Sequence, residues 1–476
     1  MTLKTNFIYS SILTTSQYLF PLIIYPYISR TLGLSNIGIV NFVDNLINYF
    51  IIISMMGIAT VGVREIASAK NERGKLSKTF SSLLSLTFIT TLIAITVLWI
   101  AMYTVPMLIP YQDLLYVGIV KLVFNLFVME WFLMGIEDFR FITIRSIIIK
   151  FIYLLCIFIY VRNALDYKIY YILSAATVIA NAVVDIIYIR KFVHFSLPSI
   201  DIRPYYKAFF IMGAYVLLTN VYISLNPVWL GFVTNTDEVG YYTTATKLYN
   251  FIMAFLLSFT NILYPRVSNL LADGKREEYW QKIKIAFEAI YLFAFPTIIF
   301  MMVAGPQLLH LIVGDGFEGA YLPFRIITPL ILIVGIEQIL VIHILMATHS
   351  DNIVLRNSLI GAITTMVFNI LLTSHLGAVG SAFVWIIVET LIMILSFIAI
   401  RHQFKFLFDY KRFFFYCINY TPLFLLSVFL YRLLENDYAI IVSTAVLTVI
   451  YAIINEIYFM KNQVALQLLQ SLKHRM

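Results

Sequence analysis

Residues 25–42 read YPYISRTLGLSNIGIVNF, and this stretch predicts a sharp turn between two apolar helices. A strongly apolar segment stops at Arg30, Gly33 follows, and a second apolar segment starts around Gly38. An arginine near the end of a helix can interact with the last carbonyl groups, and a glycine permits the chain to turn. We therefore expect a helical hairpin whose turn carries a cation.

The composition places this hairpin in a membrane protein. The chain has 476 residues, of which 61% are hydrophobic and only 12% are charged, unlike a soluble globular domain. Runs of about twenty apolar residues, each long enough to cross a bilayer as a helix, recur along the whole chain. We therefore expect an all-α polytopic membrane protein with about fourteen transmembrane helices. The loops are too short to hold a soluble catalytic domain.

The basic residues predict the orientation of these helices. Lysine and arginine gather in alternate loops, as in the segment between Arg64 and Lys78, and cytoplasmic loops carry such an excess. Both termini are therefore predicted to be cytoplasmic, and the net charge of +8 reflects this topology rather than nucleic-acid binding. The first apolar run is interpreted as a retained helix and not as a signal peptide.

A faint internal repeat predicts two similar halves. Shifting the sequence by 202 positions aligns three pairs of residues on corresponding helices, namely Gly38 with Gly240, Asn48 with Asn250, and Arg64 with Arg266. Two six-helix bundles in parallel repeat, a transporter architecture, would give this alignment. The predicted parts are an N-terminal lobe at 1–207, a C-terminal lobe at 208–404, and two extra helices with a cytoplasmic tail at 405–476.

The pattern P-x-x-x-R-x-L-G-x-x-x-x-G, which here runs from Pro26 to Gly38, resembles the first hairpin of the polysaccharide-biosynthesis (O-antigen) flippases. These flippases belong to the multidrug, oligosaccharidyl-lipid and polysaccharide exporter superfamily. Further resemblances cover residues 131–150 (WFLMGIEDFRFITIRSIIIK), 264–270 (YPRVSNL) and 361–389, which ends at Glu389. The family often has glutamine where Met134 stands. The resemblance implies a fold like that of the MATE transporters.

The resemblance also implies a function. A protein of this family translocates an undecaprenyl-diphosphate-linked oligosaccharide, such as an O-antigen or capsule repeat unit, from the inner to the outer leaflet of the bacterial cytoplasmic (inner) membrane. Alternating access of the two halves, driven by H⁺ or Na⁺, is the expected mechanism. Apart from this coupling ion no cofactor and no metal are expected. The expected partners are the lipid-linked glycan, the bilayer, a polysaccharide polymerase and a chain-length regulator, and no nucleic acid.

A diphosphate head group is anionic, so its cavity should offer buried cations, which are costly in a membrane. Lys150 lies near the middle of its span, and Lys121 lies about two turns inside another. The alternatives are that Lys150 pairs with a carboxylate, that Lys121 extends to the surface, and that the terminal arginines only anchor helix ends. The predicted substrate-binding set is Arg30, Lys121, Lys150, Arg64, Arg266, Asn48 and Asn250.

Three acidic residues within the spans are candidates for ion coupling: Glu337, Glu389 and Asp44. Glu337 and Glu389 stand closest to the middle of the membrane, where an unpaired carboxylate tends to take up a proton. Each could also pair with a base such as Lys150. Asp44 and Asn48 form a polar strip one helical turn apart, and such strips also serve to hold helices together.

The sequence contains no G-x-x-x-x-G-K-[ST], H-E-x-x-H or G-x-S-x-G motif. No catalytic residue is therefore predicted, and we expect a transporter and not an enzyme. Two alternatives stay open. A drug/cation antiporter of the same superfamily should have a cavity that favours carboxylates over basic residues. A polytopic glycosyltransferase or polymerase should have a long outer loop with paired acids, and the loop at 305–324 offers only Asp315 and Glu318.

Overall fold

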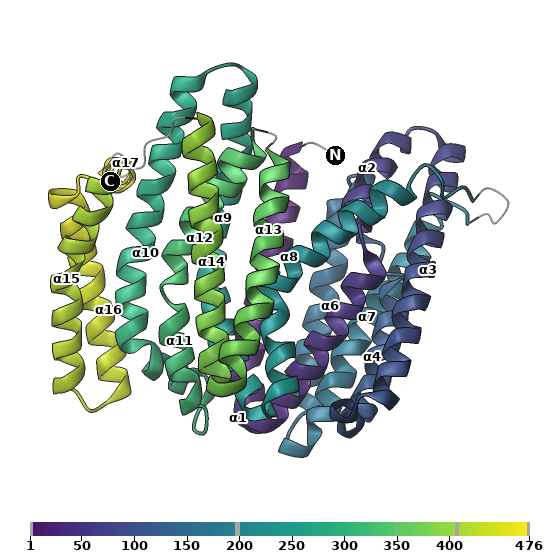
Figure 1. The fold of residues 1–476 in the computed structure, drawn as a ribbon, viewed down its shortest axis with the longest axis horizontal. Helices are drawn as coiled ribbons and strands as arrows, with labels where there is room; N and C mark the ends of the chain where they lie inside the picture. Colours follow the sequence, from purple (N-terminus) through teal and green to yellow (C-terminus); the bar gives the residue numbers. More distant parts are fainter. Residues whose placement is uncertain (1–2, 196–199, 349, 405–408, 474–476) are drawn as a thin grey trace. The chain divides into compact units, whose positions relative to one another are not determined.

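The computed structural model describes residues 3–195, 200–348, 350–404 and 409–473, and these residues form helices joined by short turns, without a strand among them (Figure 1). Within these described ranges, ten helical segments are long and apolar enough to cross a membrane, and a bent pair, Tyr206–Tyr222 with Ser224–Val233, adds one more. Two of the ten, Ile8–Ala69 and Asp351–Arg401, are 62 and 51 residues long. Since about twenty residues make one crossing, each of these holds two. The predicted all-α polytopic class is confirmed.

The chain divides into two compact units, Met1–Gly240 and Tyr241–Met476, which we call unit 1 and unit 2. The predicted three-part division at residues 207 and 404 stays a prediction. In unit 1, α8 packs on α1 and α2. The helices of unit 1 are α1 (Leu3–Met55), α2 (Ile58–Ala69), α3 (Arg73–Thr104), α4 (Gln112–Asn125), α5 (Glu130–Gly135), α6 (Phe139–Tyr160), α7 (Tyr167–Ile189) and α8 (Tyr206–Val233).

Unit 2 contains most of α9, which begins at the end of unit 1, and the helices that follow it. Its elements are α9 (Thr236–Ala272), α10 (Arg276–Val313), α11 (Tyr321–Ile327), α12 (Leu330–Gln338), α13 (Asp351–Phe368), α14 (Ser374–Phe404), α15 (Tyr410–Leu433), α16 (Asp437–Ile454) and α17 (Gln463–Lys473). Three π-helical segments interrupt this order, at Ile339–Met346, Asn369–Thr373 and Asn455–Phe459.

The predicted hairpin lies within α1. Gly33 has φ 74° and ψ 170°, a left-handed conformation that breaks the helix into two arms. Residues other than glycine rarely adopt a positive φ. Glycine is therefore required at position 33 by the backbone conformation. Arg30 is exposed in the last turn of the first arm, as expected from the sequence.

Two glycines allow α1 to approach the start of α9 closely. A Cβ atom at Gly38 would overlap the carbonyl oxygen of Thr236, and a Cβ atom at Gly240 would lie 2.9 Å from the carbonyl oxygen of Leu34. The contact is reciprocal, because the offset of 202 that relates Gly38 to Gly240 also relates Leu34 to Thr236. The offset found in the sequence therefore coincides with a backbone-to-backbone contact.

The hydrophobic core of unit 1 fixes the short helix α5. Phe80 of α3 stacks on Trp131 with ring centroids 6.0 Å apart and meets the edge of Phe132 at 5.3 Å. Gly62 of α2 leaves room for the Trp131 ring, since a Cβ atom there would come within 2.6 Å of it. The core therefore holds α5, and with it Glu130, against α2 and α3.

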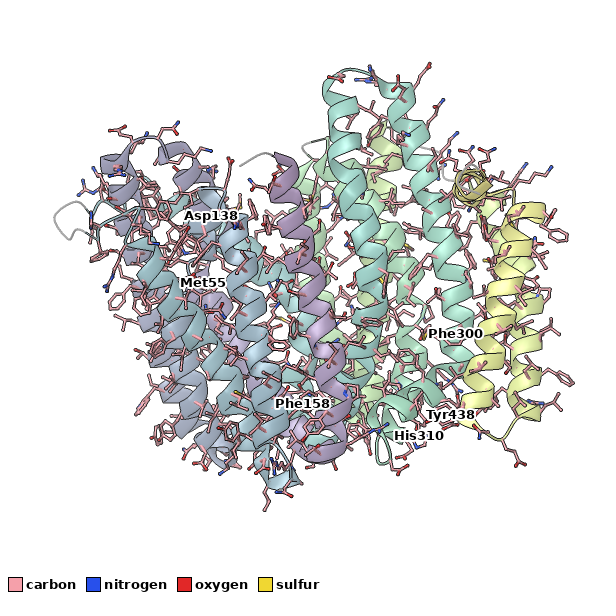
Figure 2. The ribbon with its side chains drawn as sticks, turned by 180° about the vertical axis from the view of Figure 1, so that it is seen from behind. Met55, Asp138, Phe158, Phe300, His310 and Tyr438 are labelled. Carbon is pink, nitrogen blue, oxygen red and sulfur yellow. The ribbon has the colours of Figure 1, made fainter. Side chains whose placement is uncertain are left out.

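In unit 2, polar contacts tie the last two long helices to α10 at both ends. At one end His310 Nδ1 of α10 lies 2.6 Å from Asp437 Oδ2, beside Tyr438 of α16 (Figure 2). At the other end, Glu456 accepts hydrogen bonds from the hydroxyls of Tyr416 and Tyr420 of α15, at 2.9 and 2.7 Å. Asn462 joins this group to α10 through the carbonyl oxygen of Glu288, at 2.9 Å. These contacts thus attach helices α15 and α16 to the rest of unit 2.

Replacing Gly38 by alanine should lower the melting temperature of the purified protein, because the added methyl group meets backbone and no side-chain rotation can relieve the overlap. Gly74→Ala is the matched control, since a Cβ atom at Gly74 has no neighbour within 4 Å and its φ is not positive. Thermal unfolding in detergent measures both variants. Equal melting temperatures for the two would contradict the close crossing.

Candidate functional site

Unit 1 buries an arginine between two acids within its membrane-spanning helices. Arg145 of α6 is 4% exposed and donates hydrogen bonds to Asp185 of α7 and to Glu130 of α5, the latter at 2.6 Å. Asp185 is fully buried and also accepts the backbone N–H of Met129 at 2.9 Å. A buried charge is costly unless it is paired and hydrogen-bonded, and this arrangement meets both conditions.

The break between α4 and α5 makes this arrangement available. Residues 126–129 leave the helical pattern, so the N–H of Met129 can bond to the carboxylate of Asp185 instead of to a carbonyl oxygen. Arg145 is a buried group that was not predicted from the sequence. The signal that could have found it is Asp138, which caps α6 by accepting the N–H of Phe141 at 3.2 Å, and so places Arg145 two turns inside the helix.

Lys121 of α4 forms an ion pair with Asp44 of α1, with Nζ and Oδ1 2.5 Å apart. Lys121 is 9% exposed, and its ammonium lies 5.9 Å from the centre of the Tyr171 ring. Gly118, one turn earlier in α4, lets the helices approach, because a Cβ atom there would come within 2.5 Å of Ile47. A residue predicted to bind substrate and one predicted to couple an ion are therefore partners of each other.

Lys150, the third basic residue of this interior, has a different environment. It is half-buried in α6, and its ammonium donates to the hydroxyl of Ser16 in α1 at 3.0 Å. Glu130 attracts it electrostatically, but no carboxylate among the described residues forms an ion pair with it. Figure 2 labels Asp138 and Phe158 towards opposite ends of α6, and Lys150 lies between them along the helix. The ammonium of Lys150 is thus held by a neutral group within a span.

Arg30, Arg64 and Asn48 of the predicted substrate residues do not join this interior. Arg30 lines an open pocket of about 730 Å³ with Tyr27 and Arg162, at the turn of the hairpin. Arg64 is exposed in α2, near the other end of unit 1, and pairs with Glu65 at 2.9 Å. Asn48 of α1 is exposed, as is Asn250 of α9 in unit 2. The side chain of Arg266 lies outside the described residues.

In unit 2 the two predicted mid-membrane acids lie together. Glu337 of α12 and Glu389 of α14 are 7% and 5% exposed, and their carboxyl groups lie close enough to share a proton. The indole N–H of Trp385 donates to Glu389 at 3.0 Å, and the Trp385 ring lies 4.9 Å from that of Tyr249. Within the described structure, Glu337 Oε2 and the hydroxyl of Tyr249 have no hydrogen-bond partner. A proton or a cation between the carboxyl groups would relieve their repulsion.

The backbone beside this pair is irregular. The π-helical segment Ile339–Met346 starts two residues after Glu337, and such segments frequently occur at functional sites. Within the described residues, no group of three or more histidine, cysteine, aspartate or glutamate side chains is placed to hold a metal ion. The site in unit 2 is therefore a carboxyl pair in which Glu337 Oε2 is free, among the described residues, to accept a proton or a small cation.

Comparison with known sequences gives two relatives that align over almost their whole length. One is a protein of Escherichia coli (strain K12) named "Putative O-antigen transporter", 25% identical over 415 residues, which cover 85% of this chain and 98% of the relative. The other, from Shigella dysenteriae, carries the same name and is 23% identical over 411 residues, or 84% of this chain and 100% of the relative.

Comparison with solved structures supports the fold. The lipid II flippase MurJ in an inward closed conformation has a TM-score of 0.80 at 13% identity, over 95% of this chain and 99% of that chain. MATE in the bent conformation has a TM-score of 0.52 at 13% identity, over 82% and 93% of the two chains. The family model described as polysaccharide biosynthesis protein matches residues 3–271, more than half of the chain. The chain belongs to the polysaccharide biosynthesis protein family, as its first hairpin predicts.

Proposed function

We propose that this protein is a flippase that moves an undecaprenyl-diphosphate-linked oligosaccharide, an O-antigen or capsule repeat unit, from the inner to the outer leaflet of the bacterial inner membrane. The family, the names of the two relatives and the fold shared with a lipid II flippase support a lipid-linked glycan as the cargo. The observation in the structure that best supports this proposal is the environment of Lys150.

Lys150 differs from the other interior basic residues in the kind of group that it contacts. Arg145 pairs with two carboxylates and Lys121 with one, so their charges are compensated within the protein. Lys150 has a hydroxyl partner instead, which orients the ammonium without neutralising it. A diphosphate group would place a negative charge in direct contact with the ammonium and form charge-assisted hydrogen bonds with it. Arg30, in the pocket at the hairpin turn, would meet the head group at the end of its path.

The carboxyl pair of Glu337 and Glu389 is the site that we propose for the coupling ion. Binding of H⁺ or Na⁺ there would change the charge of unit 2, and alternating access would follow if the two states of the pair favour different arrangements of the units. Asp44, the third predicted acid, is bound by Lys121, so its release would require breaking that ion pair. A polysaccharide polymerase and a chain-length regulator remain the expected partners.

The rival functions make different demands on these residues. A drug/cation antiporter should present uncompensated carboxylates to its cargo, and Lys150 would repel a cation. A glycosyltransferase or polymerase would act before or after transport, so its loss would change which intermediate accumulates. The cellular experiment below separates these functions from flipping.

Removal of the Lys150 charge should block glycan export. In a strain that lacks the gene, Lys150→Ala should restore at least about tenfold less surface glycan than wild type, because a charge-assisted hydrogen bond contributes about 1.5–3 kcal/mol. The lipid-linked intermediate should accumulate on the inner leaflet. Lys150→Arg should retain activity, and so should the control Lys168→Ala, whose lysine pairs with exposed Asp113. Surface glycan and lipid-linked intermediate are measured at matched membrane levels of the protein.

Two results of this experiment contradict the proposal. If Lys150→Ala supports normal surface glycan, the ammonium does not serve the cargo. If the strain without the gene never makes the lipid-linked intermediate, the protein acts earlier as an enzyme.

Neutralising the carboxyl pair should uncouple transport from the ion gradient. In proteoliposomes, a pH gradient or a Na⁺ gradient should speed transbilayer movement of the cargo by the wild-type protein, and the ion that does so is the coupling ion. This stimulation should be lost in Glu337→Gln and Glu389→Gln. Glu456→Gln is the matched control, because Glu456 is also buried in unit 2 but both of its oxygens accept tyrosine hydroxyls. Gradient dependence that survives in both pair variants would exclude this site.

A further inference from the structure

Unit 1 has an apolar pocket that the proposed function does not use. Its volume is about 780 Å³, in the range of about 300–1,000 Å³ typical of ligand pockets. Its walls come from α3, from the break between α4 and α5, from the last turn of α7 and from residues 193–195. None of the residues predicted to bind cargo lines it. The class of ligand must therefore be inferred from the residues that line the pocket.

The walls are mostly apolar, and two exposed rings stand at the opening. Phe80, Leu126 and Met129 form the buried floor, while Phe88 and Phe195 stand at the opening, 49% and 52% exposed. Leu92, one turn beyond Phe88 on the same face of α3, is 48% exposed and continues the apolar surface along the helix. A hydrocarbon chain lodged in the pocket could therefore extend along α3.

Two basic side chains complete the lining. Arg190 directly follows α7 and His194 comes four residues later, and both are exposed. The backbone N–H of His194 bonds to Ser77 Oγ of α3 at 3.3 Å, which ties this wall to the helix opposite. Neither the Arg190 nor the His194 side chain has a polar partner among the described residues, and no carboxylate lines the pocket. The buried acid on α7, Asp185, is already bound by Arg145.

An apolar chain site beside two unpaired basic groups fits one class of ligand. We propose that this pocket binds a single anionic phospholipid, with one acyl chain against Phe80, Phe88 and Met129 and the phosphate at Arg190 and His194. The basic residues at this end of the unit match the phosphate plane of an anionic leaflet. The lipid would be a retained component of unit 1, distinct from the transported cargo.

The test counts bound lipids on the purified, delipidated full chain by native mass spectrometry during titration with phosphatidylglycerol, phosphatidylethanolamine or undecaprenyl phosphate. Wild type should bind one phosphatidylglycerol with preference over the other two. The double variant Arg190→Gln, His194→Gln should bind it about tenfold more weakly, the effect of one lost charge-assisted contact. Lys191→Gln is the matched control, since Lys191 lies over the Tyr188 ring, 4.8 Å from its centre, and outside the pocket.

A second variant tests the chain rather than the phosphate. Ser85→Trp places a large side chain in the pocket and should also abolish the bound lipid, whereas Ile93→Trp, on the exposed outer face of α3, should not. Equal binding by wild type and the double variant would overturn the proposal, even if Ser85→Trp fails to fold. Preferential binding of undecaprenyl phosphate would overturn it as well, by assigning the pocket to the cargo.

Discussion

The cost of an ionised side chain within a bilayer governs the interior of unit 1. Arg145 and Lys121 each have a carboxylate partner on another helix, and Asp185 takes a further hydrogen bond from a broken turn. These pairs hold α1, α4, α5, α6 and α7 together by contacts that cannot be exchanged for water inside a membrane. Against that background Lys150 stands out, because its partner among the described groups is a hydroxyl. The proposed recognition of a diphosphate depends on this one difference.

The two units carry opposite chemistry in their interiors. Unit 1 offers an ammonium that has no ion pair among the described residues, which suits an anion, and unit 2 offers a close pair of carboxyl groups, which suits a proton or a small cation. A transporter that uses a cation gradient to move an anionic head group needs both kinds of site. The separation of the two sites into different units would allow each ligand to bias one half of the protein, which is the condition for coupling.

Much of the fold could be predicted from the sequence, because it follows from local properties. Apolar runs set the spans, and Gly33 in its positive-φ conformation sets the first turn. The repeat offset coincided with a contact at Gly38 and Gly240. The pairing of charges could not be predicted, since it depends on which helix faces which. Asp44 and Lys121 are 77 residues apart, and Arg145 and Asp185 are 40 residues apart. Arg145 lies two turns inside α6, because the helix starts at Phe139 after its cap at Asp138.

The measurement that tests the central claim most directly is transbilayer movement of an undecaprenyl-diphosphate-linked oligosaccharide by the purified protein. The labelled lipid is placed in the inner leaflet of sealed vesicles, and its arrival in the outer leaflet is followed with a membrane-impermeant enzyme that acts on the glycan. The account predicts arrival in vesicles that hold the wild-type protein, at a rate far above that of protein-free vesicles. Equal rates in the two kinds of vesicle, with the protein folded and inserted, would contradict it.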